Sequence, residues 1–336
     1  MRPDFFVFGV GGAGNRILNQ IKATQFANVK TVAVDTDKES LDSTRADIHI
    51  LLGNNRIKAW GEGNPAEARG AAVGALSEIK ALIKPTDIVF IVAGMGGGAG
   101  SGAASQVAMI ARLKGALVIA MITYPSRIQE KNINNANEGI KHLLHYADSV
   151  IVVDFDRYEH LPPPHLTMSQ LYSDVNRIII DVIFGLIGSL TIPSLLNADY
   201  DDLKAIFGDK GVAIILSGES DEKEKNKNES VVRNCLNSRS CDIDYRCASG
   251  CFVLITAGND LNTYDAGEIE RSLTFELDPH ASVVTSANIN ETMEEGRIHV
   301  YAIVTGIRGR IEKYHVKFDD QVHSKKKQTG QVIWTT

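Results

Sequence analysis

The sequence lacks the features that mark several classes of protein. No apolar run approaches the roughly 20 residues that a membrane-spanning helix needs, and the first residues, MRPDFFVFGV, show no charged leader followed by a cleavage site. The 35 Lys and Arg are outnumbered by 41 Asp and Glu and are interspersed, so no basic patch for nucleic acid is indicated. We expect a cytoplasmic protein that binds no nucleic acid and does not insert into a membrane.

Cysteine is scarce and is not arranged for metal binding. The four cysteines are Cys235, Cys241, Cys247 and Cys251, without a C-x-x-C pair or a histidine at zinc spacing. Cys251 stands in GCFVLITAG, which is typical of a buried strand. We therefore expect free, reduced thiols and no metal site, with Cys251 in the core.

The first half of the chain alternates strand and helix patterns. Near-continuous Val/Ile runs separated by helical segments are typical of parallel strands buried on both faces. The expected strands are 4–10, 29–37, 87–94, 115–125 and 149–155. Asn64-Pro65 indicates the start of a helix that continues to about residue 83, with Asn as the cap and Pro in the first turn.

The pattern changes after LPPPH (161–165). Thr167 and Gln170 form a capping box for a long helix that is expected over 167–190. Four strand patterns follow, with helix patterns between them, and predict a smaller α+β domain: the strands are 211–220, 250–258, 281–289 and 298–307, and the helices 229–237 and 265–277. The polar segment 219–230 predicts a solvated surface loop, and the tail from Asp319 is expected to be disordered.

Two glycine-rich loops each follow a strand and open a helix. The first, GVGGAGN (9–15), matches G-x-G-x-x-G, and Asp35 ends the next strand, as in a dinucleotide site. The second, MGGGAGSG (95–102), faces the same edge of the sheet. A dinucleotide fold uses one such loop, so two loops favour a longer polyphosphate that is held by backbone N–H groups and helix N-termini. The structural alternative is that these glycines only let helices pack tightly on strands.

The motif G-x-x-x-x-G-K-[ST] is absent, which excludes the class of proteins whose P-loop lysine contacts the phosphates. Backbone amides, a bound cation and an arginine are the groups left to meet the phosphate charge.

The two loops, GEGNP (61–65), the helix that bears Tyr172 and Asn176, and LNADYDDL (196–203) occur in the order and approximate spacing of the tubulin/FtsZ superfamily. The chain resembles an FtsZ-type protein of the prokaryotic branch from about residue 4 to residue 312. The resemblance implies a Rossmann-like parallel-sheet GTP-binding domain (1–166), a central helix (167–190), a C-terminal α+β domain (191–312) with a catalytic loop (196–203), and a flexible tail (313–336).

The resemblance also implies nucleotide contacts, which can be carried over position by position. Asn15 would lie near the guanine, and Asp35 beside the nucleotide. Tyr172 would stack on the purine, and Asn176, four residues on and thus on the same helix face, would read its edge. The phosphate contacts would come from the loops: Gly11, Gly12 and Ala13 in the first, Gly61, Gly63 and Asn64 near the terminal phosphate, and Gly96, Gly97, Gly98, Ala99, Gly100, Ser101 and Gly102 in the second.

Asn197, Asp199 and Asp202 match the loop that the family inserts into the nucleotide site of the next subunit. Carboxylates at i and i+3 can polarise a water molecule or hold it through a cation. Such a head-to-tail contact does not close and so builds a filament. Taken alone, N-x-D-x-x-D is also a common helix cap followed by an acidic first turn.

Three departures from the family pattern stand out. Ala99 replaces the usual Thr of the second loop, which predicts slower hydrolysis or weaker binding. Segment 126–134 lacks the acidic residue and the arginine that the family places at the ribose and phosphates, and Arg127 and Glu130 are the available substitutes. Asp35 stands where the family usually has Asn.

The leading hypothesis is a cytoskeletal GTPase that binds GTP with Mg²⁺, forms a head-to-tail homopolymer in cell division or cell shape, and contacts a membrane adaptor through its tail. One alternative is a nucleotide-binding polymer or regulator with little turnover. The other is an NAD-dependent oxidoreductase, as suggested by the first loop and Asp35.

Overall fold

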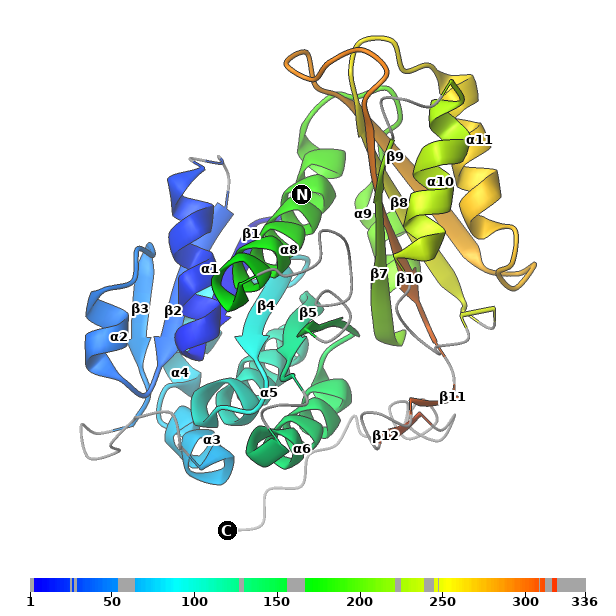
Figure 1. Ribbon diagram of the computed structural model, residues 1–336. Coiled ribbons are helices and arrows are strands. Elements are labelled where there is room, and N and C mark those ends of the chain that lie inside the picture. The colour runs from blue at the N-terminus through cyan, green and yellow to red at the C-terminus, as the bar shows by residue number, and fades with distance from the viewer. Residues whose placement is uncertain are drawn as a thin grey trace.

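The computed structural model is organised around one ten-stranded sheet, with strands in the order β3-β2-β1-β4-β5-β6-β7-β10-β8-β9 (Figure 1). The structure describes residues 3–24, 26, 29–53, 64–126, 130–155, 167–220, 225–238, 245–246, 248–307, 309–311 and 316–318. The expected fold class is confirmed, with helices on both faces of a parallel N-terminal sheet that continues into the C-terminal strands.

The N-terminal part of the sheet is parallel throughout. Its strands are β1 (Phe5–Val10), β2 (Val29–Asp35), β3 (Ile48–Leu51), β4 (Ile88–Gly94), β5 (Leu117–Tyr124) and β6 (Ser149–Asp154). β1 pairs with β2 on one side and β4 on the other, so the strand order reverses beside β1. Ligands of doubly wound sheets bind at such a switch point, outside the carboxyl ends of the strands.

The C-terminal strands extend the same sheet. They are β7 (Gly211–Glu219), β8 (Gly250–Ala257), β9 (Ser282–Ile289) and β10 (Ile298–Thr305), and a separate ribbon pairs β11 (Gly309–Ile311) with β12 (Val316–Phe318). β7 joins β6 in parallel over a short stretch and β10 antiparallel over a long one. The α+β pattern of the second half was expected. Its continuity with the first sheet was not, because it depends on the long-range pairing of β6 with β7.

The helices are α1 (Gly11–Ala23), α2 (Lys38–Asp42), α3 (Pro65–Val73), α4 (Leu76–Leu82), α5 (Gly98–Leu113), α6 (Glu130–Tyr146), α8 (Met168–Thr191), α9 (Tyr200–Phe207), α10 (Lys227–Asn237) and α11 (Thr263–Thr274). The helix expected from Pro65 to about residue 83 is two helices, because the chain turns at Gly74. The short elements α2 and β3 were not expected.

The prediction of a surface loop over 219–230 is partly wrong. α10 begins at Lys227, and the Asn226 side chain caps it by accepting a hydrogen bond from the Glu229 N–H at 3.1 Å. A polar segment can open a helix when a cap is present and apolar residues follow on one face. Here Val231 and Cys235 provide that face and are buried.

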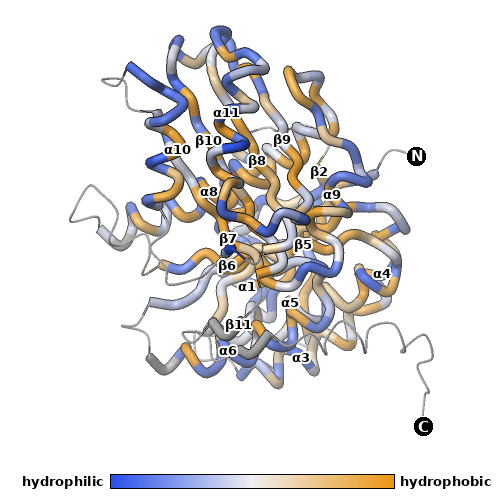
Figure 2. The backbone as a smooth tube through the Cα atoms, turned by 90° about the vertical axis from the view of Figure 1, so that its right-hand side faces the viewer, coloured by the Kyte–Doolittle hydropathy of each residue, from blue (hydrophilic) through white to orange (hydrophobic). Residues whose placement is uncertain are grey.

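The helices cover the sheet on two faces and enclose three apolar clusters. α3 to α6 pack on one face of the N-terminal strands, and α10 and α11 pack on the C-terminal strands. The cluster on the remaining face joins both halves, because α8 buries Val175, Ile179 and Ile183 among side chains from β4, β8 and β10. Figure 2 shows the hydrophobic stretches along the central strands.

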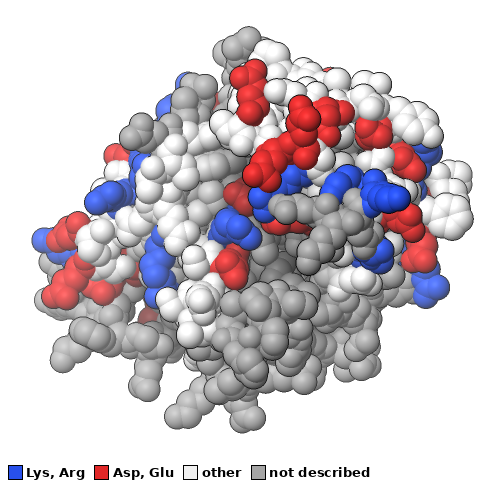
Figure 3. All heavy atoms as spheres, turned by 45° about the horizontal axis from the view of Figure 1, so that its top comes forward, with Lys and Arg blue, Asp and Glu red and all other residues white. Residues whose placement is uncertain are grey.

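Two of the four cysteines lie in the part of the chain that the structure describes. Cys251 is in the core as expected, Cys235 is buried with it, and both are free thiols, whereas Cys241 and Cys247 lie outside the described residues. Within the described ranges no group of three metal-ligating side chains occurs, and no helix has the length and apolarity of a membrane span. Acidic and basic side chains are mixed over the face shown in Figure 3.

Two glycines in the helices should respond oppositely to replacement by alanine. At Gly139 in α6, a Cβ would lie 2.9 Å from the Cα of Ser101 in α5, so Gly139→Ala should lower the free energy of unfolding by about 1–3 kcal/mol. At Gly70 in α3, nothing lies within 4 Å of a Cβ, so Gly70→Ala should raise it by about 0.5–1 kcal/mol. Urea denaturation without nucleotide measures both, and equal effects would contradict this packing.

Candidate nucleotide site

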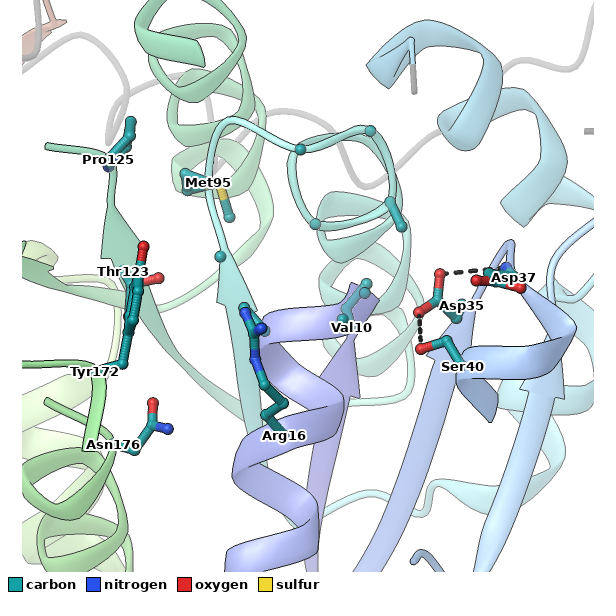
Figure 4. A pocket seen from close by; sticks show the side chains of 18 of the residues that line it. Val10, Arg16, Asp35, Asp37, Ser40, Met95, Thr123, Pro125, Tyr172 and Asn176 are labelled. Carbon is teal, nitrogen blue, oxygen red and sulfur yellow. Dashed lines mark hydrogen bonds between the residues drawn. The ribbon is translucent and has the colours of Figure 1, made fainter. Parts of the chain in front are cut away.

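A pocket of about 1040 Å³ opens at the carboxyl edge of the N-terminal strands (Figure 4). Its described wall combines both glycine loops, the turn after β2, the end of β5 and the first turns of α8. The residues that line it include Gly11, Gly12, Ala13, Arg16, Asp35, Asp37, Gly97, Gly98, Ala99, Gly100, Phe155, Tyr172 and Asn176. Sequence positions more than 150 residues apart thus meet in one cavity.

Two helices begin at this pocket without a side-chain cap. α1 follows β1 directly, α5 begins after Gly97, and neither has a capping side chain or an acidic residue in its first turn. By contrast, α2, α3, α8, α9, α10 and α11 all have side-chain caps; α4 follows α3 almost directly and is also uncapped. Free N–H groups and positive dipole ends at α1 and α5 suit an anion such as a phosphate.

The glycines of the loops fall into two groups. A Cβ at Gly14 would overlap the carbonyl oxygen of Val92, and one at Gly100 or Gly102 would overlap a backbone carbonyl as well, so packing alone requires glycine there. At Gly12 and Gly97 no atom lies within 4 Å of a Cβ. The structural alternative therefore explains the first group and gives no packing reason for the second.

Ser101 and Gly96 shape the second loop and do not line the pocket. The Gly96 N–H donates to Ser101 Oγ at 2.8 Å, and the Asn135 side chain donates to the Gly96 carbonyl at 3.3 Å. Gly96 has a φ of +108° and lies against Asn132, which only glycine can accept. These contacts hold Gly97, Gly98 and Ala99 at the wall.

The structure does not bring the Asn15 side chain to the pocket wall. Asn15 is 2 % exposed, and its amide nitrogen donates to Asp35 Oδ2 at 2.9 Å and to Ser40 Oγ at 3.3 Å. Its Oδ1 is buried without a hydrogen-bond partner among the described residues. Asn15 therefore supports the turn that carries Asp35.

Asp35 lines the pocket but is almost fully buried. Its Oδ1 accepts hydrogen bonds from the backbone N–H groups of Thr36 at 2.8 Å and Asp37 at 3.3 Å, and its Oδ2 accepts from Ser40 Oγ at 3.0 Å. Burial raises the pKa of the carboxyl, although these hydrogen bonds oppose the rise. Asp35 and Asp37 are the carboxylates of the described wall.

Tyr172 and Asn176 project into the pocket from α8, one turn apart, as their spacing predicts (Figure 4). The ring of Phe155, which sequence reasoning missed, lies nearly perpendicular to the Tyr172 ring, with an interplanar angle of 81° and the centroids 4.8 Å apart. Phe155 thus packs against Tyr172 at the pocket wall. Arg16 was also missed, although its spacing of four from Gly12 and Gln20 marks one face of α1.

Several other expected residues lie elsewhere or outside the described ranges. Asn64 caps α3 by accepting from the Ala66 N–H at 2.9 Å, and it is not in the pocket wall. Gly61, Gly63 and Arg127 lie outside the described residues, as does the side chain of Glu130, which opens α6.

Asn197, Asp199 and Asp202 lie beyond the other end of α8 from Tyr172. Asp199 and Asp202 form a reciprocal cap of α9: Asp199 Oδ1 accepts from the Asp202 N–H at 2.9 Å, and Asp202 Oδ2 accepts from the Asp199 N–H at 2.8 Å. Asn197 accepts hydrogen bonds from Ser194. The cap uses one oxygen of each carboxylate, and Asp199 and Asn197 are exposed.

A doubly wound sheet with two uncapped helix ends at its switch point defines a nucleotide-binding α/β protein. Residues 4–161 match the family model described as "Tubulin/FtsZ family, GTPase domain", and residues 211–308 match "FtsZ family, C-terminal domain". The chain belongs to the FtsZ family, whose N-terminal domain is a GTPase domain. The resemblance predicted from the loops is thereby confirmed, and the oxidoreductase hypothesis is not supported.

The most similar relatives include two archaeal proteins, each called cell division protein FtsZ 2. That of Methanocaldococcus jannaschii is 37% identical over 304 residues, covering 90% of this chain and 80% of the relative. That of Halobacterium salinarum is 38% identical over 307 residues, covering 91% and 77%. A solved structure titled as an empty FtsZ dimer from M. jannaschii superposes with a TM-score of 0.86 at 31% identity, covering 95% of this chain and 93% of the other.

Alanine at two glycines should separate ligand binding from folding. Gly97 has φ −82° and open space at its Cβ position, so Gly97→Ala should leave the stability of the fold unchanged. The added methyl group would hold a phosphate away from the backbone N–H groups. GTP binding should therefore weaken roughly 10- to 100-fold, the effect of losing a charge-assisted hydrogen bond. Gly100→Ala should instead destabilise the fold. Calorimetric titration and thermal melts measure both, and unchanged GTP affinity in Gly97→Ala would contradict the ligand explanation.

Proposed function

We propose that the chain binds GTP with Mg²⁺ in this pocket, assembles head to tail with copies of itself, and hydrolyses GTP where two copies meet. The protein would act in the cytoplasm, in cell division, as the names of its relatives suggest. The observation that carries this proposal is the separation of the nucleotide pocket from the acidic loop by the length of α8.

α8 has 24 residues, so it is about 36 Å long at 1.5 Å per residue. Its first turns carry Tyr172 and Asn176 in the pocket, and its last turn leads into the segment with Asn197 and Asp199. No residue of that segment is in the described pocket wall. A second copy stacked along this direction would bring the acidic loop of one copy to the pocket of the other.

The roles follow from the chemistry of phosphoryl transfer, which needs positioning and charge stabilisation more than covalent help. Amides at Gly12, Gly97 and Gly98 would hold the phosphates, and bound Mg²⁺ would neutralise part of their charge. The free oxygens of Asp199 and Asp202 from the next copy would polarise the attacking water. Capping and catalysis are compatible, because each carboxylate uses one oxygen for the cap.

Some predicted contacts involve residues that the structure does not describe. These are the nucleotide contacts of Arg127, of the Glu130 side chain, and of Gly61 and Gly63, together with an adaptor peptide in the tail. The nucleotide contact of Asn64 and the direct contact of Asn15 with the guanine also stay predictions. The domain limits at residues 166 and 190, which come from the family resemblance, are likewise proposals.

Asp199→Asn tests catalysis in trans without removing the cap, because Asn caps helices about as well as Asp. We expect GTP binding and stability to persist while phosphate release falls at least about a hundredfold, the usual contribution of a general base. Added to wild type, the variant should also lower turnover per wild-type subunit. The matched control is Asp201→Asn, which removes a neighbouring exposed carboxylate that takes no part in the cap.

Phosphate release and right-angle light scattering with GTP, followed against protein concentration, measure these effects. Release should rise more than linearly with concentration in wild type. Normal turnover in Asp199→Asn would refute the assignment of this loop. Scattering in the wild type without phosphate release would favour the alternative of a polymer with little turnover.

Ala99→Thr tests the missing hydroxyl of the second loop. Ala99 lies in the pocket wall beside Gly11, and a hydroxyl that hydrogen-bonds to a phosphate contributes about 1.5–3 kcal/mol. We expect turnover or GTP affinity to rise at least about tenfold in Ala99→Thr and not in Ala99→Val, which has the same shape without the hydroxyl. An equal response of the two variants in steady-state kinetics would show that the hydroxyl has no such role.

A further inference from the structure

Arg16 is a pocket residue without an assigned role. It lies on α1 one turn beyond Gly12 and one turn before Gln20, and all three line the pocket. Figure 4 shows Arg16 rising from α1 across the pocket from Tyr172 and Asn176 of α8. Among the described residues of the wall it is the only basic one.

The guanidinium is available to a ligand. The Arg16 side chain is exposed and makes no hydrogen bond or ion pair with the part of the chain that the structure describes. Two carboxylates, Asp35 and Asp37, line the same pocket, but they stand on the other side of α1 from Arg16 (Figure 4). Arg16 thus lies on the side of α1 toward α8, apart from both carboxylates (Figure 4).

The opposite wall presents an aromatic ring. Phe155 packs nearly perpendicular to the Tyr172 ring, and Tyr172 is only half-buried and lines the pocket. In Figure 4 the Arg16 guanidinium stands level with Tyr172 and below the second glycine loop. A planar base stacked on Tyr172 would therefore have its second face toward Arg16, away from the amides that suit phosphates.

We propose that Arg16 is the second wall of the base site: its planar guanidinium stacks on the face of the guanine that Tyr172 leaves open, and Asn176 meets the edge of the base. Arginine stacks on aromatic planes as lysine does not, because its charge is spread over a plane and is weakly hydrated. This inference rests on the proposed function, since it assigns a residue within the same nucleotide site.

The test is the affinity of wild type, Arg16→Ala, Arg16→Lys and the distant control Arg271→Ala for GMP, GDP and GTP, measured by calorimetric titration. A base contact predicts that Arg16→Ala weakens all three by one common factor of about ten, or about 1.4 kcal/mol, and that Arg16→Lys does not restore binding. Arg271→Ala should behave as wild type. Thermal melts of the free variants confirm that each is folded.

A phosphate contact predicts a different result. The factor would grow from GMP to GTP, and Arg16→Lys would restore most of the affinity because it keeps the charge, so either outcome overturns the inference. Unchanged binding in Arg16→Ala overturns it as well. A wild-type chain that binds no guanine nucleotide overturns the proposed function itself, which keeps the two failures distinct.

A second probe separates stacking from recognition of the base edge. An arginine that read the guanine edge would donate to O6 and N7, and 7-deaza-GDP lacks the N7 acceptor. Stacking predicts the same Arg16→Ala factor for GDP and for 7-deaza-GDP. A factor that falls toward one with 7-deaza-GDP would overturn the stacking assignment.

Discussion

The packing of α8 against both halves of the sheet is the constraint on which the rest of the structure depends. Val175, Ile179 and Ile183 are fully buried in a cluster that also contains Phe90 of β4 and Phe252 of β8. At Gly185 the helix lies so close to β8 that a Cβ would meet Leu254 at 2.7 Å, and Tyr301 of β10 donates to Asp181 at 2.8 Å. A rigid helix held on both sides sets the direction and the distance between the nucleotide pocket and the acidic loop.

Glycine serves two physical purposes in the loops. At Gly14, Gly100 and Gly102 the absence of a side chain lets helices and strands approach to contact distance, and this approach brings α1 and α5 to the same edge of the sheet. At Gly12 and Gly97 packing within the protein does not require glycine, and the open space fits the proposed approach of a phosphate to the backbone. Close packing thus creates the site, and the remaining glycines leave its amides accessible. The two uncapped helix ends meet the same need, because their N–H groups are left for a ligand.

The cap of α9 and the proposed catalysis in trans use the same carboxylates. Asp199 and Asp202 satisfy backbone N–H groups that the start of α9 would otherwise leave without partners. The cap also holds both side chains in fixed positions at the surface, and a group that must polarise water in another molecule benefits from such preorganisation. Local stability and a function in the assembled filament are therefore not competing explanations of N-x-D-x-x-D.

The sequence by itself determined the class of fold and the place of the ligand. Apolar runs such as 87–94 predict buried parallel strands, and glycine loops after two of them predict a site at their carboxyl edge, because both signals are local. Two short elements escaped prediction, α2 with five residues and β3 with four, and α10 begins two residues earlier than expected, in a polar segment. Only the tertiary structure decided which loop residues reach the cavity. Asn15 and Arg16 are neighbours in the sequence, yet the rotation of about 100° per helical residue turns Asn15 into a buried hydrogen bond with Asp35 and places Arg16 in the pocket wall. That difference depends on how α1 packs between β2 and α8, and no local pattern encodes such long-range packing.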